Sequence, residues 1–208
     1  MKRSVYRGRV EIEIEKKIPI GAGLGGGSSN AATTLKALNR LLGLNLSQRE
    51  LMKLGVEIGA DVPFFFLKGA AIGSGIGEKL RRIELPRFWF VLINPCFEVS
   101  ARWAYQNYVL TKRRFHHNIQ EFLKTPRKIS SILWNDLEEV VSKKYPQIEL
   151  MKTALISAGA LGALMTGSGP TVFGVFREEG GAAEAQKKIK RMVRGKGWFV
   201  LTAHSILA

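Results

Sequence analysis

The sequence predicts an α+β protein, and three observations support this prediction. The chain has 208 residues, of which 46% are hydrophobic, so it can bury a core in one large or two small domains. A continuous apolar run at Phe88–Ile93 is typical of a buried strand, and Thr171–Phe176 is predicted to be another strand. Patterns with the helical period, such as the one after Gly27, alternate with these runs.

The first part of the chain is predicted to hold a strand followed by a helix. Val10–Glu15 alternates apolar and acidic residues, as a half-buried strand does, and Pro19 ends the run. The helix that follows the glycines is expected to end at Gly43. Its apolar face is predicted to consist of Ala31, Leu35, Leu38, Leu41 and Leu42.

A second helix is predicted over Gln48–Ile58. Ser47 is expected to cap it, with Glu50 at the reciprocal position of a capping box. The turn Gly59–Pro63 then leads into an apolar run that resembles a strand.

Pro86 marks a domain boundary, so the expected domains cover residues 1–86 and 87–208. Residues 101–133 are rich in Arg, Lys, His and aromatic side chains and are predicted to form helices joined by a mobile loop. The remaining expected elements are a helix near Glu149–Ser157, the strand Thr171–Phe176, a basic helix after Gly180 and Gly181, and a closing strand at Trp198–Ala203.

The glycine-rich loop within Pro19–Thr34 is the most informative motif. It holds Gly21, Gly23, Gly25, Gly26 and Gly27, with Leu24 among them. Glycines allow positive φ and close approach of the backbone, so successive N–H groups can converge on an anion at the start of a helix. Ser28 or Ser29 is expected to cap that helix and to lie beside bound phosphates, within reach of Mg²⁺. A flexible structural turn is the alternative interpretation.

The loop resembles the ATP-binding motif of the GHMP kinases, Pro-x-Gly-x-Gly-Leu-Gly-x-x-Ser-Ser. The resemblance continues in the family's order through five blocks. These blocks are Ile18–Thr34, Gly59–Phe65, Gly75–Glu78, Asn135–Glu138 and Met165–Gly174. Within the family, the chain resembles most the kinases of 4-diphosphocytidyl-2-C-methyl-D-erythritol in the non-mevalonate isoprenoid pathway.

This resemblance implies a GHMP kinase two-domain fold, with a ribosomal S5 domain 2-like N-terminal domain and a ferredoxin-like C-terminal domain. It implies transfer of the γ-phosphoryl group of ATP, with Mg²⁺, to the 2-hydroxyl of the cytidine diphosphate-linked methylerythritol. The residues that it assigns to ATP are Pro19, Gly21, Gly23, Leu24, Gly25, Gly26, Gly27, Ser28 and Ser29, the two serines also being candidate Mg²⁺ ligands. The alternative enzyme is a GHMP kinase of the homoserine or mevalonate type. The Gly59–Phe65 block favours the methylerythritol kinase over this alternative.

Asp61 is the candidate catalytic residue. A carboxylate in a sharp turn between Gly59-Ala60 and Val62-Pro63 can be directed into a cleft, where it accepts the proton of a substrate hydroxyl or holds that hydroxyl in line with the γ-phosphate. A turn-capping role is the structural alternative. The resemblance favours catalysis, because the matching Asp is taken as the base in these kinases.

The turn Thr166–Pro170 is a second glycine-rich loop, whose structural alternative is an ordinary hairpin turn. By resemblance it closes over the junction of nucleotide and substrate, with contacts from Gly167, Ser168 and Gly169. Tyr105 aligns with an aromatic residue that stacks on the cytosine ring in the family. A buried core tyrosine is the alternative for Tyr105.

The net charge of +15 points to partners that carry phosphate. Basic residues cluster in Lys112–Arg114 and Lys187–Lys196, and nucleic-acid binding is the non-enzymatic alternative. The second cluster falls on a helical pattern, so its charges are expected to form a solvated face. The apolar positions of this pattern are Ala182, Ala183, Ala185, Ile189 and Val193.

The composition predicts a cytoplasmic protein, because no apolar stretch has the length of a membrane span or of a secretion signal. The one cysteine, Cys96, is expected to pack in the core beside a strand. His116 and His117 are expected in a solvated loop rather than at a metal ion. The expected partners are ATP and the small-molecule substrate, and a homodimer is considered as the assembly.

The sequence departs from the family pattern at two places. Asn30 stands where many relatives carry Asp after the serine pair, which keeps the hydrogen-bonding capacity and removes a charge. The family's N-terminal Pro-Ala-Lys-x-Asn motif and its Tyr-His pair have no match here. We therefore expect an N-terminally truncated chain with a partial first domain, and a short homologue with a binding role is the alternative.

Overall fold

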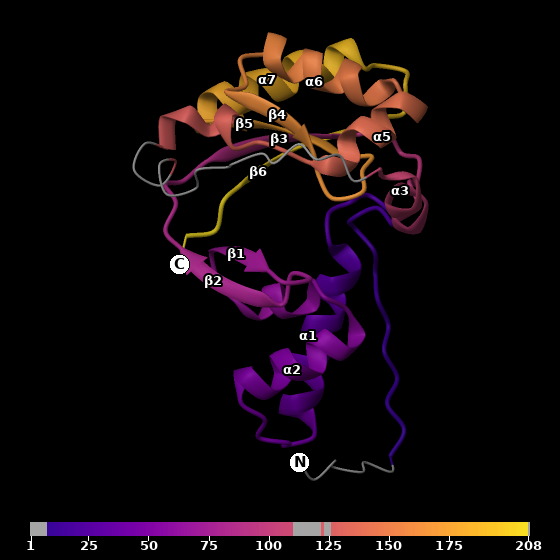
Figure 1. Ribbon diagram of the computed structural model, residues 1–208, viewed down its shortest axis with the longest axis vertical. Coiled ribbons are helices and arrows are strands. Elements are labelled where there is room, and N and C mark those ends of the chain that lie inside the picture. The colour runs from indigo at the N-terminus through magenta and orange to yellow at the C-terminus, as the bar shows by residue number, and fades with distance from the viewer. Residues whose placement is uncertain (1–7, 110–121, 123–125, 208) are drawn as a thin grey trace. The chain divides into compact units, whose positions relative to one another are not determined.

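In the computed structural model, residues 8–109, 122 and 126–207 are described (Figure 1). The chain divides into two compact units. The first contains the residues up to Ile20 with Gly26–Leu67 and Gly73–Arg81, and the second contains Gly21–Gly25, Lys68–Ile72 and Arg82–Ala208. Gly21–Gly25 therefore belongs to the second unit despite its early place in the sequence. The boundary at residue 86 stays a prediction.

The first unit is built on the helices α1 (Gly26–Leu41) and α2 (Gln48–Ile58) and the 3-10 helix η1 (Val62–Phe66). Its buried apolar cluster consists of Ala32, Leu51, Val62 and Phe66. The loop between α1 and α2 is fixed by Asn39, whose Nδ2 donates to the Leu46 carbonyl at 3.0 Å and whose Oδ1 accepts from the Leu46 N–H at 2.9 Å. After η1, the strands β1 (Ala70–Ser74) and β2 (Lys79–Ile83) form a two-stranded sheet.

The predicted capping box of α2 is confirmed. The Ser47 hydroxyl accepts from the Glu50 N–H at 3.3 Å, and the Glu50 carboxylate accepts from the Ser47 N–H at 2.9 Å. The backbone hydrogen bond from Ser47, assisted by its hydroxyl, lowers the pKa of Glu50. The contribution of Glu50 to stability is therefore present above its unfolded-state pKa and is lost as the pH falls through the lower folded-state value.

Replacing Ser47 with alanine is expected to lower the free energy of unfolding by about 1 kcal/mol, because it removes the cap from the start of α2. Denaturant unfolding of both chains measures the change. Ser142→Ala, within the helix of residues 136–144, is the matched control, since its hydroxyl donates to the Glu139 carbonyl inside the helix and caps no helix start. Equal stabilities for Ser47→Ala and the parent would contradict the assigned role of the cap.

The second unit contains an antiparallel sheet in the spatial order β4-β5-β3-β6. Its strands are β3 (Trp89–Asn94), β4 (Gly162–Met165), β5 (Val172–Phe176) and β6 (Phe199–His204). Its helices are α3 (Ala101–Asn107), the 3-10 helix η2 (Pro126–Ser131), α5 (Asp136–Lys144), α6 (Gln147–Ser157) and α7 (Glu179–Met192). With α6 before β4 and α7 before β6, the order along the chain is that of a ferredoxin-like fold, as expected.

Helices α6 and α7 cover one face of this sheet (Figure 1). Gly174 on β5 lets α6 approach closely, because a Cβ at this position would stand 2.9 Å from a methyl carbon of Leu155. Phe173 and Val175 alternate with Gly174 and join an apolar cluster with Phe88 and residues of η2. Strand β5 is therefore packed on both faces, and the predicted strand Thr171–Phe176 lies inside the sheet.

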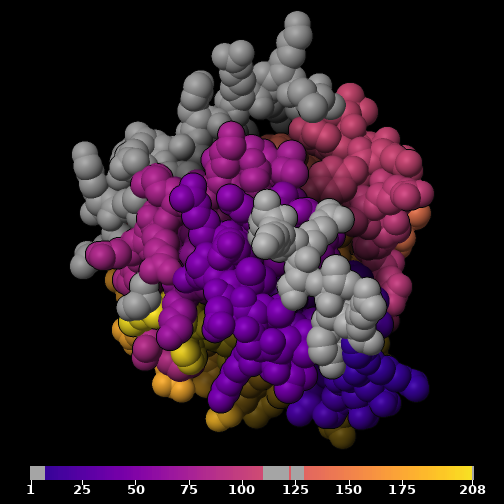
Figure 2. All heavy atoms as spheres, turned by 90° about the horizontal axis from the view of Figure 1, so that it is seen from below, coloured from indigo at the N-terminus to yellow at the C-terminus, as the bar shows by residue number. Residues whose placement is uncertain are grey.

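The expectations for α2, β3, α6, β5 and β6 are confirmed. The expected strand at Val10–Glu15 is wrong, because these residues have no strand pairing within the described chain. Ile12 and Ile14 are about half exposed, at 53% and 50%, and the indigo segment lies on the surface in Figure 2. The apolar run after Asp61 is also no strand, because it forms the 3-10 helix η1.

Three further expectations are corrected at single residues. Helix α1 begins at Gly26, so Ser28 and Ser29 lie inside its first turn and neither is the N-cap. Leu41 is exposed rather than on the buried face, because α1 ends there. Cys96 is exposed after β3 with a φ of 60°, so it is not packed in the core.

Some predictions fall on residues whose placement is not described. The basic cluster at Lys112–Arg114 and the histidines His116 and His117 lie outside the described residues. Among the helices that are described, none is long and apolar enough to cross a membrane.

Candidate active site

The first glycine segment packs directly against the second glycine-rich turn within one unit of the protein. The Thr166 hydroxyl donates to the Gly23 carbonyl at 3.0 Å. A Cβ at Gly23 would stand only 2.2 Å from the Thr166 carbonyl oxygen, and one at Gly167 would stand 3.0 Å from the Gly23 carbonyl oxygen. Both glycines have positive φ, 71° and 55°. Glycine is therefore required on both sides, because two backbones meet where side chains have no room.

The second turn closes on itself through backbone hydrogen bonds. The Thr166 N–H donates to the Thr171 carbonyl and the Gly169 N–H donates to the Thr166 carbonyl, both at 2.9 Å. The peptide bond between Gly169 and Pro170 is cis. The turn joins the antiparallel strands β4 and β5, so it is a hairpin connection fixed by its own backbone bonds, and its contact with phosphate stays a prediction.

A cavity of about 480 Å³ opens beside this turn. Tyr105 from α3 and Gly167 from the turn both line it, as do Tyr108, Trp134 and Asn135. Tyr105 is 68% exposed, which excludes the alternative of a core tyrosine. Two of the predicted substrate residues therefore share one cavity. Within the described chain, Ser168 and Gly169 are not among the residues that line it; Ser168 is half-buried and Gly169 is buried.

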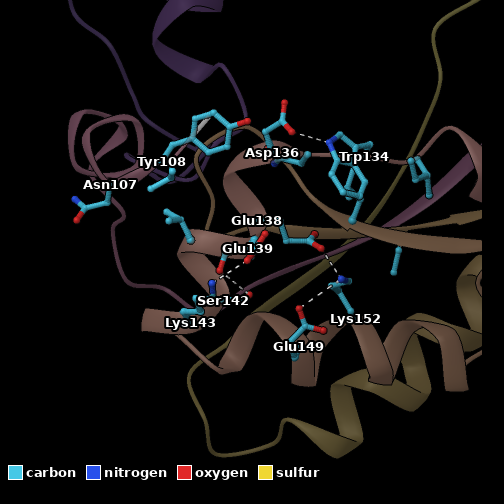
Figure 3. Close-up of a pocket in the computed structure, with 16 residues that line it drawn as sticks. Asn107, Tyr108, Trp134, Asp136, Glu138, Glu139, Ser142, Lys143, Glu149 and Lys152 are labelled. Atoms are coloured by element: carbon cyan, nitrogen blue, oxygen red, sulfur yellow. Dashed lines mark hydrogen bonds and ion pairs between the residues drawn. The ribbon is translucent and has the colours of Figure 1, made fainter. Parts of the chain in front are cut away.

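A second cavity of about 450 Å³ shares Trp134 and Asp136 with the first as lining residues (Figure 3). Asp136 accepts a hydrogen bond from Trp134 Nε1 at 2.7 Å. Partial burial raises the pKa of Tyr108, and the nearby carboxylate of Asp136 raises it further. Tyr108 therefore stays a neutral phenol that can donate a hydrogen bond.

The floor of this second cavity is an ion pair between α5 and α6. Lys152 is paired with Glu138 and lies 3.5 Å from Glu149 (Figure 3). Burial opposes the charged form of Lys152, but the hydrogen bond and charge of Glu138 outweigh it and raise the pKa of Lys152. The pair therefore stays charged and holds the two helices together.

Asp61 lies in the first unit, immediately before η1. Its backbone conformation is helical, with φ −82° and ψ −15°, and its side chain makes no capping hydrogen bond to η1. The side chain of Asp61 therefore does not cap η1, and its catalytic role stays a prediction. Its Oδ1 lies 3.7 Å from the position that a Cβ on Gly77 would take, so the turn after β1 comes next to the carboxylate. That turn is held by Glu78, which accepts from the Ile76 N–H at 2.8 Å.

The first turn of α1 presents the two serines, and Asn30 follows them. With its amide in the orientation that satisfies both partners, Asn30 donates to the Gly26 carbonyl at 3.3 Å and accepts from Lys16 Nζ at 3.2 Å. Asn30 thus bonds to a lysine where an Asp would form an ion pair.

Within the described residues, no group of three or more His, Cys, Asp or Glu side chains is arranged to hold a metal ion. Serine hydroxyls alone are too few for Mg²⁺, which needs further oxygens such as those of a nucleotide.

Comparison with known proteins identifies the family. Residues 1–69 match the GHMP kinases N terminal domain, and residues 116–195 match the GHMP kinases C terminal domain. The chain belongs to the GHMP kinase family. This membership confirms the two-domain α+β fold and makes the chain a small-molecule kinase with ATP as the phosphate donor.

Several relatives similar to this GHMP kinase carry the same name. A 4-diphosphocytidyl-2-C-methyl-D-erythritol kinase of Pelobacter propionicus is 47% identical over 196 residues, which cover 94% of this chain and 69% of the relative. The kinase of the same name from Syntrophus aciditrophicus is 50% identical over 202 residues, covering 95% of this chain and 70% of the relative.

Solved structures agree with the family. A crystal structure of 4-(cytidine 5'-diphospho)-2C-methyl-D-erythritol kinase matches with a TM-score of 0.75 and 30% identity, covering 93% of this chain and 69% of the other. A homoserine kinase from Cytophaga hutchinsonii matches with a TM-score of 0.79 at 21% identity, covering 92% of this chain and 68% of the other, which shows the shared fold alone.

The site thus combines predicted and unpredicted residues. The glycines of both loops and Tyr105 were predicted, and the structure brings Gly23, Gly167 and Thr166 into contact. Asn135, Asp136 and Glu138 were noted only as part of a sequence block. Their position next to the turn depends on contacts with residues about thirty positions away, which no local pattern reveals.

Proposed function

We propose that this GHMP kinase transfers the γ-phosphoryl group of ATP to the 2-hydroxyl of 4-diphosphocytidyl-2-C-methyl-D-erythritol. The observation that carries the proposal is the agreement of relatives at 45 to 50% identity, all named as kinases of this substrate. The exposed ring of Tyr105 beside the second glycine turn supports it, because a ring at the edge of a cavity can stack on a base.

The phosphates of ATP are proposed to bind at the first glycine segment and at the start of α1. The positive φ of Gly21, Gly23 and Gly25 allows the N–H groups there to converge on an anion, and α1 begins directly afterwards with its positive dipole end. Pro19, Leu24, Gly26 and Gly27 belong to the same proposed site. Ser28 and Ser29 add hydroxyls in the first turn of the helix.

Asp61 is proposed to act on the acceptor. Its carboxylate takes the proton of the 2-hydroxyl while that oxygen forms a bond to the γ-phosphorus, and the bond from phosphorus to the bridging oxygen breaks to release ADP. Gly167 and Ser168 are proposed to donate to phosphate oxygens. Gly169 belongs to the same proposed substrate site through the shape of the turn, because its own N–H is bonded to the Thr166 carbonyl. Mg²⁺, with Ser28 or Ser29 among its ligands, would neutralise charge on the phosphates when bound.

The direct test measures ADP release with ATP and each of three acceptors. These acceptors are the cytidine diphosphate-linked methylerythritol, homoserine and mevalonate. The 208-residue chain matches about 70% of its relatives' length. The assay therefore includes both this chain and one extended upstream in its gene. Turnover with the first acceptor alone is expected. Turnover with homoserine or mevalonate alone would replace the proposed substrate, and no turnover by either form would contradict the kinase assignment.

The basic alternative is tested by the same preparation. Nucleic-acid binding would appear as affinity for RNA or DNA that falls steeply with salt and does not change in Asp61→Asn. We instead propose that the net charge of +15 steers phosphate-bearing substrates, so added salt should lower kcat/KM more than kcat. A cytoplasmic location and a homodimer complete the proposal.

A further inference from the structure

At the end of β4, the backbone of Met165 is bonded by side chains from the start of α5 and its cap. Strand β4 is at the edge of the sheet, so its outward N–H and C=O groups need other partners. The Met165 N–H donates to Glu138 Oε2 at 2.7 Å. The carbonyls of Met165 and Gly167 both accept from Asn135 Nδ2, each at 2.8 Å. The start of α5 therefore takes the role of a fifth strand where the glycine turn begins.

Asn135 is chemically specific for this position. Its Oδ1 accepts from the Leu137 N–H at 3.0 Å and so caps α5, while both Nδ2 hydrogens have carbonyl partners. Asp would preserve the cap but would place a carboxylate against two carbonyl oxygens. Asp, Ser or Thr would cap α5 equally well. The two hydrogen bonds that Nδ2 donates therefore explain why the side chain at position 135 is an amide.

The opposite side of the same turn contacts the first glycine segment. Thr166, which lies between the two carbonyls held by Asn135, donates its hydroxyl to the Gly23 carbonyl at 3.0 Å. A chain of direct contacts thus runs from α5 through Asn135 and Thr166 to Gly23. Glu138 acts differently, because it is held by Lys152 and bonds only before the turn, at Met165.

We infer that Asn135 is a positioning residue for phosphoryl transfer, which fixes the second glycine turn against the first. This inference rests on the proposed function for its reaction and on the contacts above for its geometry. Asn135 also lines the cavity that holds Tyr105, so the residue that sets the turn lies at the site where the substrate is proposed to bind. Phosphoryl transfer depends on positioning, so a loosened turn costs rate even when the fold remains.

The first measurement is hydrogen exchange of the Thr166 and Gly169 amides in Asn135→Asp. These two amides are protected by bonds within the turn, and the variant keeps the α5 cap while it removes the donated bonds. We expect their exchange to become at least about tenfold faster. The matched control is Asn39→Asp, which removes an Nδ2 bond to a backbone carbonyl in the first unit and also keeps its Oδ1 acceptor. Unchanged exchange in Asn135→Asp would overturn the inference, whatever reaction the protein catalyses.

The second measurement is steady-state kinetics of the same variants. Asn135→Asp is expected to lower kcat by about tenfold with a much smaller change in the KM for ATP, whereas Asn39→Asp should stay within about twofold of the parent. Faster exchange with unchanged kcat would overturn the role in catalysis. The turnover of the parent tests the proposed function separately, because the exchange result does not depend on the substrate.

Discussion

Asp61→Asn is expected to lower kcat by at least about a hundredfold, with little change in the free energy of unfolding. The variant keeps the size and shape of the side chain but cannot accept the proton of the acceptor hydroxyl. Stability should be retained, because Asp61 is exposed and its side chain makes no capping bond to η1. Steady-state rates of ADP release, with thermal unfolding of the same samples, measure both quantities.

The control is the matching substitution of a carboxylate by an amide elsewhere in the first unit. Glu57→Gln removes one exposed carboxylate from α2 and should leave kcat within about twofold of the parent. If Asp61→Asn keeps more than about a tenth of the parent rate, Asp61 is not the base. Catalysis would then depend on the glycine loops and the phosphate charges, as loose transition states for phosphoryl transfer allow.

An element of the fold could be predicted where the residues that determine it lie within the element itself. The capping box of α2 was predicted to the residue, because Ser47 and Glu50 are three positions apart and contact each other. Strand β3 was predicted because burial on both faces leaves a continuous apolar run. Val10–Glu15 has the alternation of a strand, but strand formation requires hydrogen bonds to another segment, which the described residues do not supply.

The site shows the same division. Gly23 and Gly167 were identified because glycine clusters mark close backbone approach, although the sequence does not say which backbones meet. Asn135 was not assigned a role, because its partners Met165 and Gly167 lie 30 and 32 positions away. Tyr105 remained open between core and cavity, since the same short helix would suit either. Its exposure decides the location, and its stacking role stays a prediction.

Gly23→Ala is expected to lower kcat/KM for ATP by about a hundredfold, since a shift of about 1 Å in the reacting groups has effects of this size. The added Cβ would stand 2.2 Å from the Thr166 carbonyl oxygen and 3.0 Å from Gly169 backbone atoms. None of these is the end of a flexible side chain, so one of the two backbones must move. The movement separates the segment that we propose to bind phosphate from the turn that contacts it. ATP saturation curves of the variant and the parent measure the loss.

Gly197→Ala is the control that distinguishes the two effects of an alanine at Gly23, backbone strain and steric collision. Gly197 has a φ of 68°, close to the 71° of Gly23, but a Cβ there would meet nothing within 4 Å. Both variants therefore share the cost of an alanine in the left-handed region, about 1 kcal/mol, and only Gly23→Ala adds the collision. If both lower kcat/KM for ATP equally, strain alone explains the loss. If only Gly23→Ala does, the contact between the two glycine loops is what nucleotide use requires.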